Sequence, residues 1–416
     1  MKNSIVVFIS IFLFHSIFIY LDDGSGIGRR IQAGCTILPL LFVFSKIRYF
    51  FSIKKVNVAV LLYCLLLLVT SILSKSIDIS YLHSSGIDGG EDYKSTSYSV
   101  GILYAINFLM LFTYVNYFTK IGKIHILFDT FFKISLFYVV ITDLIFIVVG
   151  NIFFEGYLIG NKFNVSYLHI FCAIFFCMKG LYSRGSYNKL TFYFLLMFAL
   201  VISIVVQCTT ALLGCIIVFC MFFYKSYFKR KIYNVWVFIV ILAFCSSFFF
   251  LFSFALENPI IQYVIVDVLG KDPTLSYRTV IYSGIGESLT LRPLWGFGVE
   301  NAHSILRFSL GFANAQNGIL NLLLEQGIFG VVSFLFLLIT ILKYNNNKNT
   351  YNRKLSYPLL VYILMYIIIS SVEITFNSSF IALLLLLPAY NTKNKHLNNK
   401  SANHKNIVSQ NEYTQS

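Results

Sequence analysis

Three arginines between Asp272 and Gly330 have side chains suited to binding phosphate. They are Arg278, Arg292 and Arg307. A guanidinium keeps its charge and presents a planar fork of donors that matches phosphate oxygens. We therefore expect these arginines to bind the diphosphate of a lipid-linked substrate. For each of them, the alternative is contact with lipid headgroups or an ion pair with a nearby carboxylate.

A polar stripe follows the arginines. Asn317, Asn321 and Glu325 recur every four positions, so they share one face of a helix whose other faces are rich in leucine. Asn314 is expected to cap this helix. Gln316 and Asn317 then lie at its N-terminus, where free N–H groups and the helix dipole favour an anion such as the diphosphate. The alternative is that the asparagines only join helices to one another.

Two further acidic residues fall at or near membrane depth. Glu373 lies in a later connection between apolar runs, and Asp143 lies inside one. Ionisable groups inside a membrane are costly and are functional candidates by default. Glu373 is preferred because its connection is expected on the same side as the arginines, whereas Asp143 is interpreted as a buried, hydrogen-bonded acid.

The composition predicts a polytopic membrane protein that positions these residues with helices. The chain has 416 residues, of which 58% are hydrophobic and only 12% are charged. Several apolar runs reach the roughly 17 residues that span a bilayer. They are continuous and too long for barrel strands of about 10 residues, so the expected fold is an all-α bundle.

Twelve apolar ranges are predicted to be transmembrane helices. They are Ser4–Tyr20, Ile31–Ser45, Val56–Ser74, Ser99–Phe118, Ile134–Phe154, Ser166–Leu181, Leu190–Gln207, Ala211–Tyr224, Ile232–Ala255, Gly327–Leu342, Pro358–Ser371 and Ser378–Tyr390. The first reads as an uncleaved helix because no small-residue cleavage site follows it. No internal repeat of fixed period is present, which disfavours inverted-repeat transporters.

The charged residues predict that both termini are cytoplasmic. Most Lys and Arg fall in alternate connections, and most acidic residues fall in the others, as the positive-inside rule requires. Arg29 and Arg30 fall outside and are the exception. The net charge of +15 thus follows from topology, and no nucleic-acid role is needed.

The long connection before the tenth predicted helix is expected to fold as a cap over the outer mouth of the bundle, because it is rich in aromatic and apolar residues. A straight helix from Asn314 to Leu342 would be about 43 Å long, more than the roughly 30 Å hydrocarbon core, so we expect a break near Gly327. The expected parts are 1–255 for nine helices, 256–326 for the outside loop, 327–390 for three helices and 391–416 for a disordered cytoplasmic tail.

The eight cysteines and seven histidines do not predict a metal site. The cysteines lie in or beside apolar stretches, where they act as small packing residues rather than a disulfide framework. The histidines are scattered and have no partners at ligand spacing. We therefore assign no metal.

One region of the sequence resembles a known family. Arg278 with Pro293–Gly298, followed by Gln316-Asn317 and Gly327–Gly330, is similar to the signature region of the O-antigen polymerase and O-antigen ligase superfamily. The resemblance is best in the last third of the chain. It implies a polytopic inner-membrane glycosyltransferase with a large periplasmic loop, which uses undecaprenyl-diphosphate-linked sugars and no metal or other cofactor.

The chain departs from the family pattern at two places. Gln316 stands where the family often has His, and Thr209-Thr210 stands where it often has Ser-Arg. Glutamine cannot accept a proton as a base. The other candidate bases are Glu325, Glu287 and His303. Because ligases depend on that His more than polymerases do, the resemblance favours a polymerase.

The prediction is therefore an O-antigen polymerase that transfers a growing glycan from undecaprenyl diphosphate to the next lipid-linked repeat unit at the periplasmic face. Arg278 is the first choice for stabilising the departing diphosphate, assisted by Arg292 and Gln316. The predicted catalytic residues are Arg278, Gln316 and Glu325. The predicted substrate-binding residues are Arg292, His303, Arg307, Asn317, Asn321 and Glu373.

Three alternatives stay open at this point. A ligase that transfers finished glycan to lipid A core is the nearest. A flippase for the lipid-linked oligosaccharide also suits twelve helices, but it does not need a large external cap. A nutrient or ion transporter is the third. Besides the lipid-linked oligosaccharides and membrane lipids, a chain-length regulator and a flippase are the candidate partners.

Overall fold

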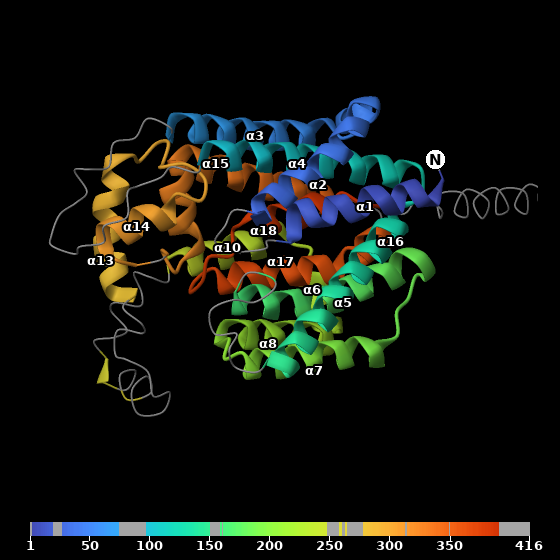
Figure 1. Ribbon diagram of the computed structural model, residues 1–416. Coiled ribbons are helices and arrows are strands. Elements are labelled where there is room, and N and C mark those ends of the chain that lie inside the picture. The colour runs from blue at the N-terminus through green and yellow to red at the C-terminus, as the bar shows by residue number, and fades with distance from the viewer. Residues whose placement is uncertain are drawn as a thin grey trace, which may run out of the picture.

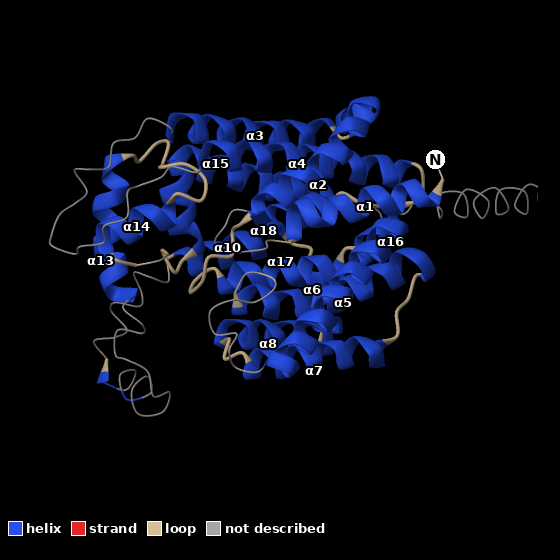
Figure 2. Cartoon of the chain, in the orientation of Figure 1, coloured by secondary structure: helices blue, strands red, loops and turns tan. Residues whose placement is uncertain are grey.

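The computed structural model describes residues 2–19, 27–74, 97–149, 159, 161–247, 258–259, 263, 278–312, 314–348 and 350–390. The regular elements in these ranges are all helices (Figure 2). The expected all-α class is thereby confirmed for the described part of the chain.

The helices follow the apolar ranges closely. Their bounds are α1 (Asn3–Phe18), α2 (Ile27–Val43), η1 (Phe44–Ser52), α3 (Lys54–Leu73), α4 (Ser97–Lys120), α5 (Ile124–Val149), α6 (Lys162–Arg184), α7 (Lys189–Val205), α8 (Thr209–Phe223), α9 (Lys225–Lys231), α10 (Val235–Ser246), α13 (Arg278–Leu291), α14 (Ala302–Leu310), α15 (Gly318–Asn346), α16 (Thr350–Leu355), α17 (Tyr357–Ile369) and α18 (Ser378–Leu386). Each of the twelve predicted ranges overlaps one of these helices.

Six helices among the described residues are long and apolar enough to cross a membrane. The number becomes seven if α8 and α9, which meet at 97°, form one broken span. Shorter apolar helices are α1, α7, α10 and α17. The chain is thus a polytopic helical membrane protein, whereas the count of twelve spans stays a prediction.

Helix α5 begins ten residues before the start predicted for this span at Ile134. Its early turns carry charged residues that form ion pairs. Asp129 bridges Lys133, one turn later, and Lys179 of α6, with N–O distances of 2.8 Å for both. A hydropathy window scores each charged residue separately, so the predicted span begins after these residues.

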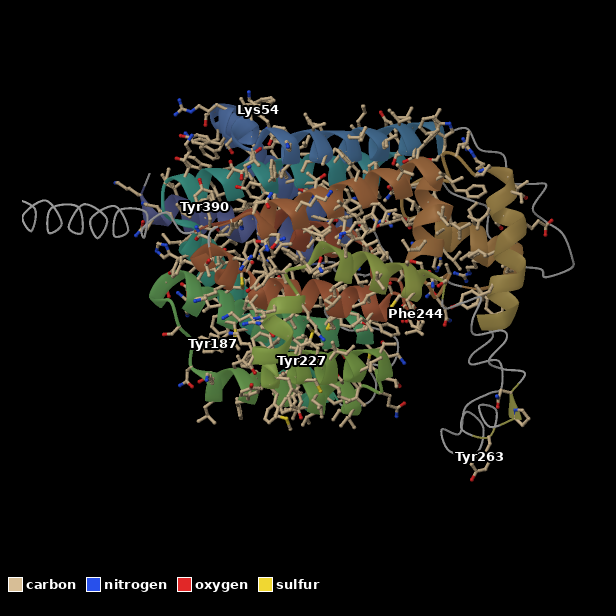
Figure 3. The ribbon with its side chains drawn as sticks, turned by 180° about the vertical axis from the view of Figure 1, so that it is seen from behind. Lys54, Tyr187, Tyr227, Phe244, Tyr263 and Tyr390 are labelled. Atoms are coloured by element: carbon tan, nitrogen blue, oxygen red, sulfur yellow. The ribbon has the colours of Figure 1, made fainter. Side chains whose placement is uncertain are left out.

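The helices of the bundle run side by side, and α13 and α14 lie across one end of it (Figure 1). The N-terminus lies at the opposite end, and so do Lys54 and Tyr390 (Figure 3). We call α13, α14 and the loop 292–301 that joins them the cap.

The cap has a hydrophobic cluster separate from the core of the bundle. Ile285 of α13, Phe297 of the loop, Ile305 of α14 and Leu324 of α15 are all buried in it. Burying these side chains together removes apolar surface from water, which holds the cap on the first turns of α15. The described residues of the expected cap are therefore folded. Most of residues 256–277 and all of 391–416 lie outside the described part.

Helix α15 is interrupted at Gly327, which has φ 64° and ψ −168°. The break expected near this residue is confirmed. The N-cap is Asn317, whose side chain accepts hydrogen bonds from the backbone N–H groups of Ile319 and Leu320 at 3.1 Å. The prediction that Asn314 is the N-cap of this helix is therefore wrong. Asn314 instead accepts from the N–H of Gln316 at 3.0 Å, in the turn before the helix.

Candidate functional site

The loop of the cap forms hydrogen bonds with α15 at the break in this helix. A helix that stops and restarts leaves carbonyl and N–H groups without partners in the helix. Four backbone hydrogen bonds supply them: Phe297 N to Leu324 O at 2.7 Å, Gly298 N to Glu325 O at 2.7 Å, Ile328 N to Pro293 O at 2.8 Å and Phe329 N to Leu294 O at 3.2 Å. The segments Pro293–Gly298 and Gly327–Gly330 are therefore one structural unit.

Two glycines allow this close approach. Gly296 and Gly327 have φ of 67° and 64°, which disfavours residues with a Cβ. A Cβ on Gly296 would lie 2.6 Å from the backbone nitrogen of Gln326, and one on Gly327 would lie 2.3 Å from the carbonyl oxygen of Leu294. The unit thus fixes the backbone of Glu325, whose carbonyl oxygen accepts from Gly298 N and lies next to Gly296.

A cavity of about 760 Å³ lies where the cap meets the bundle. Its lining combines charged, amide and aromatic side chains. The groups that ionise are Arg29, Glu300, His303 and Glu325; the amides are Gln32, Asn161, Asn164, Asn314, Asn321, Gln326 and Asn377; and the aromatic rings include Phe18, Tyr63, Tyr104, Phe108, Tyr167, Tyr366 and Phe376. The cavity is therefore built from both ends of the sequence and from the cap.

Two carboxylates stand in this cavity. Glu300 of the cap forms an ion pair with Arg29 of α2 at 3.2 Å, and the hydroxyl of Tyr104 donates to its other oxygen. Glu325 of α15 accepts from the amide of Asn321 at 3.1 Å. The two carboxylates are close enough to interact electrostatically. Glu300 also has φ of 60°, which costs about 1 kcal/mol or more for a residue with a Cβ.

Arg29 is a site residue that the sequence reasoning missed. It appeared there only as an exception to the positive-inside rule. The structure accounts for the exception, because the side chain lines the cavity and pairs with a carboxylate on the cap. A basic residue on the wrong side of a charge pattern was the signal that could have identified it.

Three predicted site residues line the cavity. Asn321 and Glu325 lie on the same face of α15, as their spacing indicates, and His303 projects from α14 and is exposed. Of the other candidate bases, Glu287 is exposed on α13 and lies outside the cavity lining.

The remaining predicted residues have other positions. The guanidinium of Arg292 donates to the carbonyl of Leu73 at the end of α3, at 3.3 Å, and so satisfies a helix terminus. Arg307 is exposed on α14, outside the cavity lining. Arg278 is the first residue of α13, but its side chain lies outside the described part of the chain.

Gln316, Asn317 and Glu373 lie beside the cavity lining rather than in it. Gln316 has φ of 47°, and its carbonyl accepts from the hydroxyl of Tyr282 at 3.2 Å. Asn317 is fully buried, and besides capping α15 its amide donates to the carbonyl of Ser371 at 3.4 Å, which fits the helix-joining alternative. Glu373 accepts from the N–H of the next residue at 3.2 Å.

Asp143 lies elsewhere, on α5. Its carboxylate is 3.2 Å from Nε2 of His169 on α6, a residue that is almost fully buried. This agrees with the interpretation of Asp143 as a hydrogen-bonded acid inside the bundle. Among the described residues, no three His, Cys, Asp or Glu side chains gather as they would to hold a metal ion.

Comparison with known proteins bears on residues 192–335, about a third of the chain. This region matches a family described as O-Antigen ligase. It runs from α7 through the cap to the first part of α15, and so it contains the paired segments Pro293–Gly298 and Gly327–Gly330. A search of curated proteins finds no match to the chain. The family match supports placing the chain in the O-antigen polymerase and ligase superfamily, and it does not separate polymerases from ligases.

Proposed function

We propose that this protein is an O-antigen polymerase, which transfers a growing glycan from a lipid-linked diphosphate to a hydroxyl of the next lipid-linked repeat unit. The observation that carries the proposal is the cavity under the cap. It brings the carboxylates of Glu300 and Glu325 together with Arg29. Its lining includes Val299, Glu300, Glu325 and Gln326, which directly flank the paired segments Pro293–Gly298 and Gly327–Gly330 in the region that matches the family.

The lining suits a glycan. Sugar rings have apolar faces that pack on aromatic side chains, and their hydroxyls pair with amides. Tyr167, Tyr366 and Phe376 supply rings, and Asn161 and Asn377 supply amides. A volume of about 760 Å³ lies within the usual range of ligand pockets, roughly 300 to 1,000 Å³.

Glu325 is the proposed general base. Its carboxylate would take the proton of the acceptor hydroxyl as that oxygen bonds to the anomeric carbon of the donor sugar. The bond from this carbon to the diphosphate breaks at the same time, and its electron pair leaves with the diphosphate oxygen. Glu325 is preferred over Glu287 because it lines the cavity, and over the exposed His303 because a hydrogen bond from Asn321 orients it.

The departing diphosphate needs positive charge nearby. Arg29 lines the cavity, and its pairing with Glu300 holds it at the junction of the cap and the bundle. Arg278, the first choice from the sequence, remains part of the proposal. Arg292 and Arg307 lie outside the cavity lining, so we propose no direct contact with the diphosphate for them.

A ligase that transfers finished glycan to lipid A core is the second candidate, because the matching family is described by that activity. The preference for a polymerase rests on Gln316, which occupies a position where the family often has His. Under either activity, we propose an inner-membrane location with the cap in the periplasm and both termini in the cytoplasm.

The test is a gel of surface lipopolysaccharide from a strain that lacks this gene and carries either the wild-type gene or a variant. The wild-type gene should restore the ladder of chain lengths. Glu325→Gln should leave core with a single repeat unit, since loss of a general base costs about 10² to 10⁴ in rate. Glu287→Gln, which removes an exposed acid outside the cavity lining, is the matched control and should keep the ladder at equal protein level.

The other outcomes are equally informative. Core without any repeat unit in the deletion strain would show that the protein is a ligase or an export protein. A normal ladder in the deletion strain would refute a role in chain assembly. A normal ladder with Glu325→Gln alone would refute Glu325 as the base and leave the polymerase proposal standing.

A further inference from the structure

Three cations gather over two tyrosine rings at the end of the bundle opposite the cap. Tyr49 of η1 and Tyr117 of α4 have ring centroids 4.7 Å apart. Lys46 Nζ lies 5.2 Å from the centroid of Tyr117. Arg48 Cζ and Lys120 Nζ lie 5.0 and 5.5 Å from the centroid of Tyr49. Contacts of this kind hold a cation over the face of an aromatic ring.

The cluster has no acidic counterpart nearby in the sequence. Residues 44–57 and 112–127 contain no Asp or Glu. The next acid, Asp129, is already bridged to Lys133 and Lys179 at 2.8 Å. In the described part of the chain, none of the ion pairs includes one of the three clustered cations. Gathered like charges repel one another, so an anion bound between them would be stabilised.

The same short helix also exposes apolar side chains. Phe44 is 71% exposed, Ile47 46% and Phe51 59%. Basic and large apolar residues that alternate on a surface segment are typical of the membrane interface, where the rings enter the acyl region and the cations reach the headgroups. Lys54, just after η1, lies at the end of the bundle away from α13 (Figure 3), which places the segment at the edge of the spans.

We propose that Lys46, Arg48 and Lys120 bind the phosphate of an anionic phospholipid, and that the rings of Tyr49 and Tyr117 hold these three side chains in place. The partner is identified by its charge and by its acyl chains, which the exposed side chains of η1 would contact. The site is at the end of the molecule opposite the catalytic cavity, so it does not depend on the proposed transferase activity.

The test is native mass spectrometry of the detergent-purified protein with added phosphatidylglycerol, phosphatidylcholine or inorganic phosphate. The variant replaces Lys46, Arg48 and Lys120 by Gln. The matched control replaces Lys189, Lys229 and Arg230 by Gln, which removes the same charge elsewhere. A basic residue near a membrane surface contributes about fivefold to binding an anionic lipid. The first variant should therefore bind phosphatidylglycerol at least tenfold more weakly, while the control binds it like the wild type.

If the first variant retained as much phosphatidylglycerol as the wild type, the proposal would be overturned. An equal loss in both variants would overturn it as well, because binding would then follow total charge alone. Two other results would also overturn it. If inorganic phosphate binds as tightly as phosphatidylglycerol, the site binds an anion without lipid specificity, and if phosphatidylcholine is retained equally, the contact is purely apolar. If the first variant does not fold, a salt titration of the wild type replaces it: unchanged retention of phosphatidylglycerol from low to high salt would overturn the proposal.

Discussion

Replacing Gly327 by Ala should disconnect the cap from the bundle and abolish activity. Gly327 has φ 64° and ψ −168°, a region open almost only to glycine, and an Ala there costs about 1–3 kcal/mol. The new Cβ would also lie 2.3 Å from the carbonyl carbon and oxygen of Leu294, and backbone atoms cannot rotate away as a side chain can.

The movement needed to relieve this overlap would break the loop-to-helix hydrogen bonds. Ile328 N to Pro293 O and Phe329 N to Leu294 O lie beside the clash, and each is worth about 0.5–1.5 kcal/mol. Together with the conformational cost, the substitution should destabilise the docked loop by about 2–6 kcal/mol, which is 30-fold or more in its equilibrium constant. Because the carbonyl of Glu325 accepts from Gly298 N of the same loop, the proposed base would lose its position when the loop moves.

The assay has two readouts: the lipopolysaccharide ladder in cells, and the fraction of detergent-purified protein that stays folded after brief heating. Gly286→Ala is the matched control. A Cβ at Gly286 meets nothing within 4 Å, and Ala is favoured over Gly in a helix by about 0.5–1 kcal/mol. The control should keep the ladder and the heat resistance. If Gly327→Ala matched it in both, the reasoning about the paired segments would be refuted.

Three further predictions follow from single contacts. Arg29→Gln should lower the yield of the lipopolysaccharide ladder roughly tenfold or more, because it removes the positive charge of the cavity and the ion-pair partner of Glu300. An unchanged gel would exclude Arg29 from the site. Asn317→Ala should cost about 1 kcal/mol through the lost cap of α15, seen as a lower melting temperature, and Asn317→Ser should recover most of it. Burial lowers the pKa of Lys348 to about 7, so between pH 7 and its ordinary value near 10.5 the unfolded chain holds more protons than the folded one. Relative to Lys348→Met, the wild type should therefore gain stability from pH 7 to 9, and a flat difference in melting temperature would contradict the shift.

Local patterns were enough to predict much of the architecture. Hydropathy indicated a helical membrane bundle because bilayer lipid forces each apolar run to satisfy its own backbone groups. The spacing of Asn321 and Glu325 placed both on one helix face, and the helix period alone decides that relation. The break near Gly327 followed from a helix longer than the membrane core together with a residue that tolerates positive φ.

Where local signals competed, the sequence was less informative. Asn314 and Asn317 are both good caps, and only the fold shows that α15 starts after Asn317. The three arginines chosen for their chemistry also looked alike, but Arg292 satisfies a carbonyl at the end of α3, while Arg307 lies on the exposed surface of α14. Side-chain type states what a residue can bind, and its neighbours in space determine what it does bind.

The sequence by itself determined the helices, their apolar faces and the amide–carboxylate stripe on α15, because these depend on residues within a few turns of one another. Only the tertiary structure decided that Arg29 meets Glu300, 271 positions later, and that Tyr104 meets it from a third helix. It also decided that the loop of the cap completes the break in α15. Such contacts depend on how the whole bundle packs, and no periodicity along the chain records that packing.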